Sequence, residues 1–118
     1  MAFNFFKKKT ESTGGSDFSA IDSNEKAIEF YKQQQLEKLY LMPLKFGGED
    51  IHLNVVYVPE FVKTFKEKFD FMIEGFLIEG KELNYSATPE YKGKSFIPSK
   101  LIIEVSGDVN LNETINIW

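Results

Sequence analysis

Residues 59–80 read PEFVKTFKEKFDFMIEGFLIEG, and this stretch decides the fold. Pro59 suits the first residue of a helix, where its missing N–H costs nothing. The apolar residues after it recur at steps of one, three or four, as on one face of a helix; they are Phe61, Val62, Phe65, Phe69, Met72, Ile73 and Phe76. On a wheel of 100° per residue they fall within about 120°. We therefore expect a helix over residues 60–79 with a broad aromatic stripe in the core.

The opposite side of the same helix carries a second apolar line. Phe71 and Ile78 are seven residues apart, which places them on one line about 140–160° from the centre of the stripe. Glu67 and Glu74 lie beside them. Either another part of the chain covers this line, or it is an apolar ridge in an acidic frame that suits a basic protein partner.

Upstream, the pattern predicts a first helix and then a hairpin. Asp22 and Glu25 fit a capping box at the start of a helix whose apolar face extends to Leu39. Residues 40–46 and 51–58 read as two strands joined by a glycine-rich turn, with the second strand central in the sheet.

Downstream, three strands are expected. The first covers residues 83–87 and ends before Pro89, and the second starts at residues 101–105. An irregular loop, residues 89–99, separates them, and residues 114–118 form the last strand. The order α-β-β-α-β-β-β predicts an α+β domain with two helices packed on one face of a mostly antiparallel sheet of about five strands.

The start of the chain has a different composition. Residues 1–20 combine Lys7-Lys8-Lys9 with serine, threonine and glycine, which predicts a flexible tail before a single domain over residues 21–118. The alternative is a surface anchor in which phenylalanines enter an anionic interface beside the lysines; these are Phe3, Phe5 and Phe6.

Composition excludes several classes of function. The chain has no cysteine, which excludes disulfides and thiolate sites and favours a reducing compartment, the cytoplasm. No apolar run approaches the ~20 residues of a membrane span. All 14 basic residues are lysine and the net charge is −4, so nucleic acid is a poor partner. Abundant lysine, asparagine and isoleucine without arginine suits an AT-rich bacterial genome.

No motif for catalysis, a cofactor or a metal is complete. Gly93-Lys94-Ser95 lacks the earlier glycine of a phosphate-binding loop, and Pro98 interrupts a following helix. Residues 108–112 begin like a calcium loop, but Glu113 stands where glycine is required. His52 is the only histidine and is expected on the outer face of a strand. We therefore predict no catalytic residue, no cofactor and no metal, although spacing cannot reveal a carboxylate pair that meets only in the fold.

The 89–99 loop holds two further candidates for partner binding. Tyr91 and Phe96 are aromatic residues among lysines and prolines, and such residues often anchor interfaces. Alternatively, they fold back over the edge of the sheet.

In general build, a short, acidic, cysteine-free α+β chain without enzyme motifs, the sequence resembles the small cytoplasmic immunity proteins of bacterial toxin systems. The resemblance implies a non-enzymatic domain that occludes a basic toxin, helped by its negative charge. One alternative is a small-ligand-binding or enzyme domain with a pocket between the 60–79 helix and the sheet. Another is a self-associating structural module.

Overall fold

A computed structural model describes residues 17–118. Its elements follow the order α2, β1, β2, α3, β3, β4 and β5, which confirms the predicted α+β class and order. Their bounds are Asn24–Lys32 (α2), Glu37–Tyr40 (β1), Val55–Val58 (β2), Glu60–Ile78 (α3), Leu83–Glu90 (β3), Lys100–Gly107 (β4) and Leu111–Asn116 (β5). Two short 3-10 turns, Leu44–Phe46 and His52–Asn54, lie between β1 and β2.

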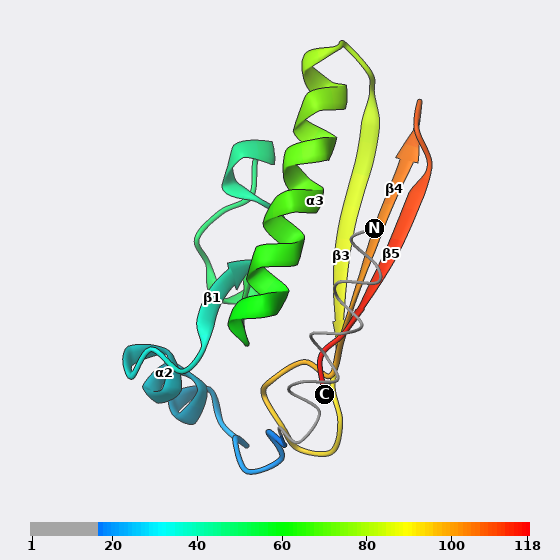
Figure 1. Ribbon diagram of the computed structural model, residues 1–118. Coiled ribbons are helices and arrows are strands. Elements are labelled where there is room, and N and C mark those ends of the chain that lie inside the picture. Colours follow the sequence, from blue (N-terminus) through cyan, green and yellow to red (C-terminus); the bar gives the residue numbers. More distant parts are fainter. Residues whose placement is uncertain (1–16) are drawn as a thin grey trace.

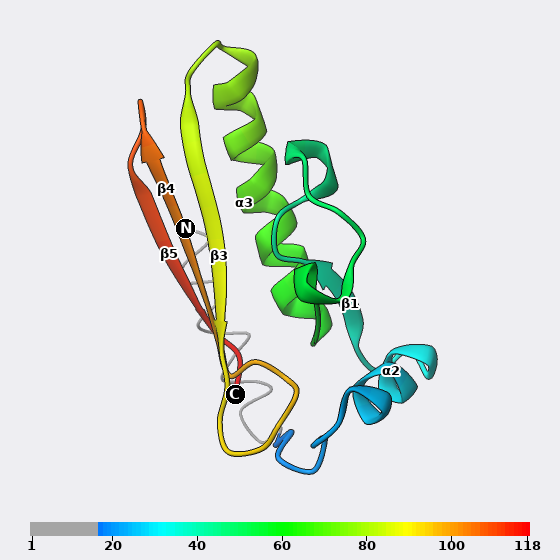
Figure 2. The ribbon, with the colours of Figure 1, turned by 180° about the vertical axis from the view of Figure 1, so that it is seen from behind.

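The five strands form two antiparallel sheets rather than one, a hairpin of β1 and β2 and a sheet in the order β3-β4-β5. The second hairpin strand is therefore not central in a large sheet. Figures 1 and 2 show α2, β1 and α3 on the same side of the three-stranded sheet. Pro89 lies inside β3, contrary to the prediction that this strand ends before it. Proline has no N–H to donate, and β3 tolerates it because it is an edge strand.

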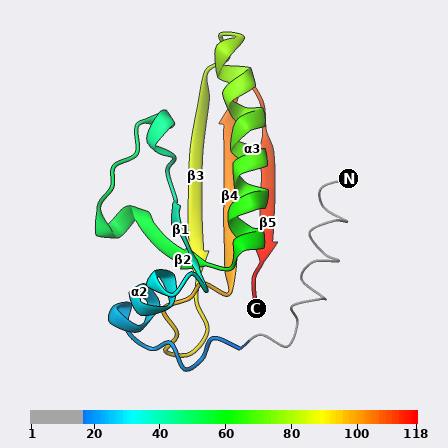
Figure 3. The same cartoon turned by 60° about the vertical axis from the view of Figure 1, so that its left-hand side comes forward.

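The core lies between α3 and the three-stranded sheet, and Figure 3 shows α3 in front of β4 and β5. Phe61, Phe65 and Phe69 on α3 are at most 7% exposed, which confirms the aromatic stripe. The β4 side chains that join them in the core, Leu101, Ile103 and Val105, are at most 2% exposed. Met72 lies at the margin of the stripe and is 43% exposed. Pro59 is the N-cap of α3 rather than its first residue.

The first helix is shorter than predicted and is capped differently. The Ser23 side chain, not that of Asp22, accepts a hydrogen bond from the Lys26 N–H, at 3.1 Å. Gln34 adopts a left-handed conformation with φ of 63°, which stops the helix after Lys32. Leu39 therefore belongs to β1 and not to the helix.

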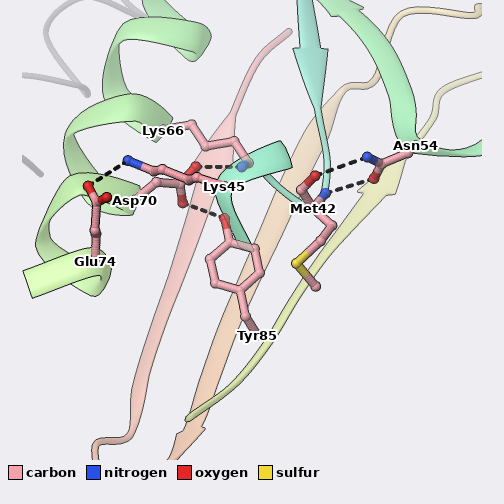
Figure 4. Close-up of polar contacts among 7 residues, drawn as sticks. All are labelled: Met42, Lys45, Asn54, Lys66, Asp70, Glu74 and Tyr85. Atoms are coloured by element: carbon pink, nitrogen blue, oxygen red, sulfur yellow. Dashed lines mark hydrogen bonds and ion pairs between the residues drawn. The ribbon is translucent and has the colours of Figure 1, made fainter. Parts of the chain in front are cut away.

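The segment between β1 and β2 is held by Asn54 instead of extending the strands. Its side-chain amide donates to the Met42 carbonyl at 2.9 Å, and its Oδ1 accepts from the Met42 N–H at 2.8 Å (Figure 4). The same amide also donates to the Glu49 carbonyl at 2.9 Å. A Cβ at Gly48 would lie 2.0 Å from the Met42 carbonyl oxygen, so only glycine fits there. His52 consequently lies on a 3-10 turn and not on a strand as predicted.

Part of the predicted tail belongs to the domain. The Phe18 ring packs edge-on against Trp118, with centroids 6.0 Å apart, and the Ser95 hydroxyl donates to the Phe18 carbonyl at 2.7 Å. These contacts cover a second apolar cluster, so the domain begins before residue 21. The other tail features, Lys7-Lys8-Lys9 and the phenylalanines before them, lie outside the described residues.

Candidate protein interface

The outer face of α3 carries the predicted apolar line. Phe71 is 73% exposed and Ile78 is 81% exposed. Within residues 17–118 nothing covers them, so the expectation that another segment buries this line is wrong for the described chain. We call Phe71, Ile78, Glu67 and Glu74 the α3 ridge.

The two carboxylates of the α3 ridge differ in their surroundings. Glu67 is exposed and forms no ion pair with any described residue, and the same is true of Glu60, two turns earlier on the same line of α3. Glu74 is half-buried and accepts a hydrogen bond from Lys45 Nζ at 3.0 Å (Figure 4). The acidic frame is therefore partly neutralised beside the 3-10 turn of Lys45, and it is open at Glu67.

A hollow of about 510 Å³ adjoins the ridge, between α3 and β1. Phe71 forms part of its wall, together with Leu44, which is 49% exposed. Its lysines are paired: Lys38 lies 3.0 Å from Asp50, and Lys63 lies 3.5 Å from Glu37. The Lys63–Glu37 pair joins α3 to β1, whereas the Lys38–Asp50 pair lies within the segment from β1 to β2, and the two pairs do not converge on a substrate-sized centre.

A buried polar cluster closes the inner end of this hollow. Lys66 is 1% exposed and Asp70 is 6% exposed, and Lys66 Nζ donates to Asp70 Oδ2 at 2.7 Å. The Tyr85 hydroxyl donates to Asp70 Oδ1 at 2.5 Å, so a single carboxylate connects α3 to β3 (Figure 4). Burial lowers the pKa of Lys66, although Asp70 opposes the shift. Burial, and then the hydrogen bond to Asp70, hold the pKa of Tyr85 far above its usual value.

This cluster of Lys66, Asp70 and Tyr85 was not predicted from the sequence. Lys66 and Asp70 are four residues apart, which is the spacing of a helical ion pair, but such pairs are usually exposed. Tyr85 comes from a strand 15 residues further along the chain. The one available signal was therefore an acid–base pair at the border of the aromatic stripe.

Tyr91 and Phe96 lie on a different surface. They line a groove of about 590 Å³ beside β2, are 48% and 45% exposed, and burial raises the pKa of Tyr91. The groove and the hollow beside α3 share no lining residue. The structure therefore does not bring all six predicted binding residues together but divides them between the α3 ridge and this groove.

Residues that the sequence analysis considered for catalysis or phosphate binding also line the groove. His52 and Lys94 line it, with exposed Leu53 at its rim. The Ser95 hydroxyl donates to the Phe18 carbonyl and accepts from the Ile97 N–H, so it is occupied in holding the loop. Across residues 17–118, histidine, aspartate and glutamate form no group of three or more that could hold a metal ion.

Comparison with protein-family models and with curated proteins adds no relative. No protein-family model matches the chain, and no curated protein matches it significantly. In the described part of the chain, no helix has the length and apolar character needed to cross a membrane. The case for a function therefore rests on the surfaces themselves.

Proposed function

We propose that the chain is a non-enzymatic protein-binding domain that uses the α3 ridge to hold a basic partner. The observation that carries the proposal is the exposure of Phe71 and Ile78 on a rigid helix, beside a carboxylate, Glu67, that lacks an ion pair within residues 17–118. Aromatic and aliphatic anchors framed by polar groups are the usual core of a protein interface.

The free energy gained by burying Phe71 and Ile78 indicates how large the interface has to be. Covering Phe71 and Ile78 contributes ~1.5–3 kcal/mol each, which is less than association costs for a stable complex. A partner must therefore extend beyond the ridge. Other exposed apolar side chains that could extend the contact are Leu44 on the hollow and Met72 and Leu77 on α3, at 49%, 43% and 38% exposed.

Within this class, the role we propose is that of an immunity or inhibitor protein that occludes a bacterial toxin in the cytoplasm. A net charge of −4 would speed the encounter with a basic partner. Binding by a surface ridge blocks the partner sterically and needs no catalytic group on this chain.

A small-ligand or enzyme function is the second candidate. The groove beside β2 favours it, because about 590 Å³ with mostly apolar walls is a usual size for a ligand site. The hollow between α3 and the hairpin is a poorer candidate, since its lysines are paired with carboxylates. A self-associating structural module is the third candidate, and it predicts a concentration-dependent mass.

Affinity capture with matched variants tests the proposal. The full chain would be immobilised and exposed to lysate of the cell that makes it, and the captured proteins identified by mass spectrometry. We expect a basic protein that the Phe71→Ala variant loses and that the Phe96→Ala variant keeps. If Phe96→Ala lost the protein and Phe71→Ala kept it, the interface would be the groove beside β2. Sedimentation of the free chain would show any self-association.

A further inference from the structure

Gly75 lies in the middle of the α3 ridge, and no contact within residues 17–118 requires a glycine there. It is a helical residue, and its φ is not among the positive values that require glycine. The glycine that follows the helix end is Gly80, with φ of 92°. Within residues 17–118, a Cβ at Gly75 would meet nothing within 4 Å, so no described neighbour excludes alanine. Because glycine is a poor residue for a helix interior, its presence here is a cost to the isolated domain.

The neighbours of Gly75 on the helix surface define a depression. Phe71, Glu74, Gly75 and Ile78 occupy positions i, i+3, i+4 and i+7 of α3. Four residues at this spacing form the hole that receives one side chain of a facing helix in knobs-into-holes packing. Phe71 and Ile78 are large and exposed, and Gly75, at position i+4, has no side chain. The hole is therefore open on the side of Gly75 and has one acidic side.

A second copy of this chain is a poor occupant of the hole. In a two-fold pair of antiparallel α3 helices centred on Gly75, the acidic flank of one helix faces the acidic flank of the other. The two copies of Glu74 would then lie close together, which disfavours the pair, whereas Glu67 would face the chain beyond the end of the other copy's α3. A lysine- or arginine-bearing helix has the charge complementary to Glu67, which forms no ion pair with any residue of the described range 17–118.

We infer that Gly75 is a specificity-determining residue of the interface, and that its hole takes one bulky apolar side chain from a basic amphipathic helix of another protein. The inference rests on the proposed function of the α3 ridge. It explains why the position has no side chain. It also predicts that Gly75→Ala stabilises the free protein and weakens binding.

The first effect is on the free protein. Alanine has a better helix propensity, and no described residue obstructs its methyl group, so Gly75→Ala should raise the thermal midpoint by about 2–5 °C. A lower midpoint would show that the glycine is needed inside the domain, and the inference would be wrong.

The second effect is on binding. The probe is a fluorescein-labelled 18-residue amphipathic helix made of leucine and lysine, added to the full chain and followed by fluorescence anisotropy. Gly75→Ala partly fills the hole, and we expect about tenfold weaker binding, a factor that corresponds to about 1.4 kcal/mol. Phe71→Ala should weaken binding at least as much, Phe96→Ala should leave it unchanged, and a leucine–glutamate peptide should not bind.

The outcomes separate the hole from the ridge. If Phe71→Ala weakens binding and Gly75→Ala does not, the hole is refuted and the ridge stands. If neither variant weakens binding, or amide shifts caused by the peptide map to Tyr91 and Phe96, the proposed interface fails with it. Equal binding of the glutamate peptide, or dimerisation of the free chain through α3, would refute the basic helix as the occupant.

Discussion

Replacing Asp70 by asparagine removes a charge from the buried cluster and keeps its shape. An asparagine can still accept the hydrogen bond from Tyr85, but it gives Lys66 no counter-charge. Because Lys66 is 1% exposed, its ammonium would remain buried and unpaired. Breaking a buried ion pair in this way costs about 3–5 kcal/mol, out of the about 5–15 kcal/mol that stabilise a typical domain.

The cost of Asp70→Asn should also depend on pH, because it acts through the proton on Lys66. Burial already lowers the pKa of Lys66 below its ordinary 10.5, and the loss of Asp70 lowers it further. Between the folded and the ordinary pKa, the unfolded chain binds the proton and the folded chain does not, so stability rises with pH in that window. The deficit of the variant should therefore be largest near neutral pH and should shrink as pH approaches the ordinary pKa.

A second substitution identifies the source of the loss. Lys66→Met removes the unpaired ammonium, so the double variant should recover much of the stability lost in Asp70→Asn alone. Urea unfolding at two pH values, followed by Trp118 fluorescence and circular dichroism, measures all four proteins of the cycle. A loss below about 1 kcal/mol for Asp70→Asn, with no recovery in the double variant, would refute the buried charged pair.

Three further predictions follow from the same contacts. Phe65→Ala should cost ~3–5 kcal/mol in urea unfolding and Phe71→Ala under about 1 kcal/mol, whereas equal losses would place Phe71 in the core. The raised pKa of Tyr85 keeps its phenol protonated in the folded state, so stability should fall as pH rises above the ordinary value of 10.0, and a Tyr85→Phe variant should lose less stability there. If phenolate absorbance at high pH showed Tyr85 ionised before unfolding, that reasoning would fail. Phe18→Ala should shift Trp118 emission to longer wavelength and cost about 1–3 kcal/mol, and an unchanged spectrum would contradict the contact between the two rings.

Helix α3 was predictable because its own sequence contains the information. The stripe from Phe61 to Ile73 repeats at the helical period, and burial of large rings outweighs any local preference. The same periodicity placed Phe71 and Ile78 outward, since one helix cannot turn both lines to one sheet. Where a pattern is long and regular, spacing alone fixed both the element and its buried face.

The errors arose where distant contacts override local patterns. Residues 51–54 alternate like a strand, but the hydrogen bonds of Asn54 fold them into a 3-10 turn. From the sequence, Lys66 is expected on the surface. In the fold it is buried with Asp70, to which Tyr85 of β3 also donates a hydrogen bond. Spacing could not place Tyr91 and Phe96 on a groove separate from α3, because that depends on how the loop folds against β2.

The contact between Phe18 and Trp118 has a consequence for folding during synthesis. The second apolar cluster joins residues near 18 with Ile97 and Trp118, so it cannot close before residue 118 has left the ribosome. Contacts over such long sequence separations raise the contact order and slow the final folding step. On a ribosome-bound chain, the apolar side of α2 would therefore stay exposed until Ile97 and Trp118 can pack on it. Chaperones would bind this end of the domain first.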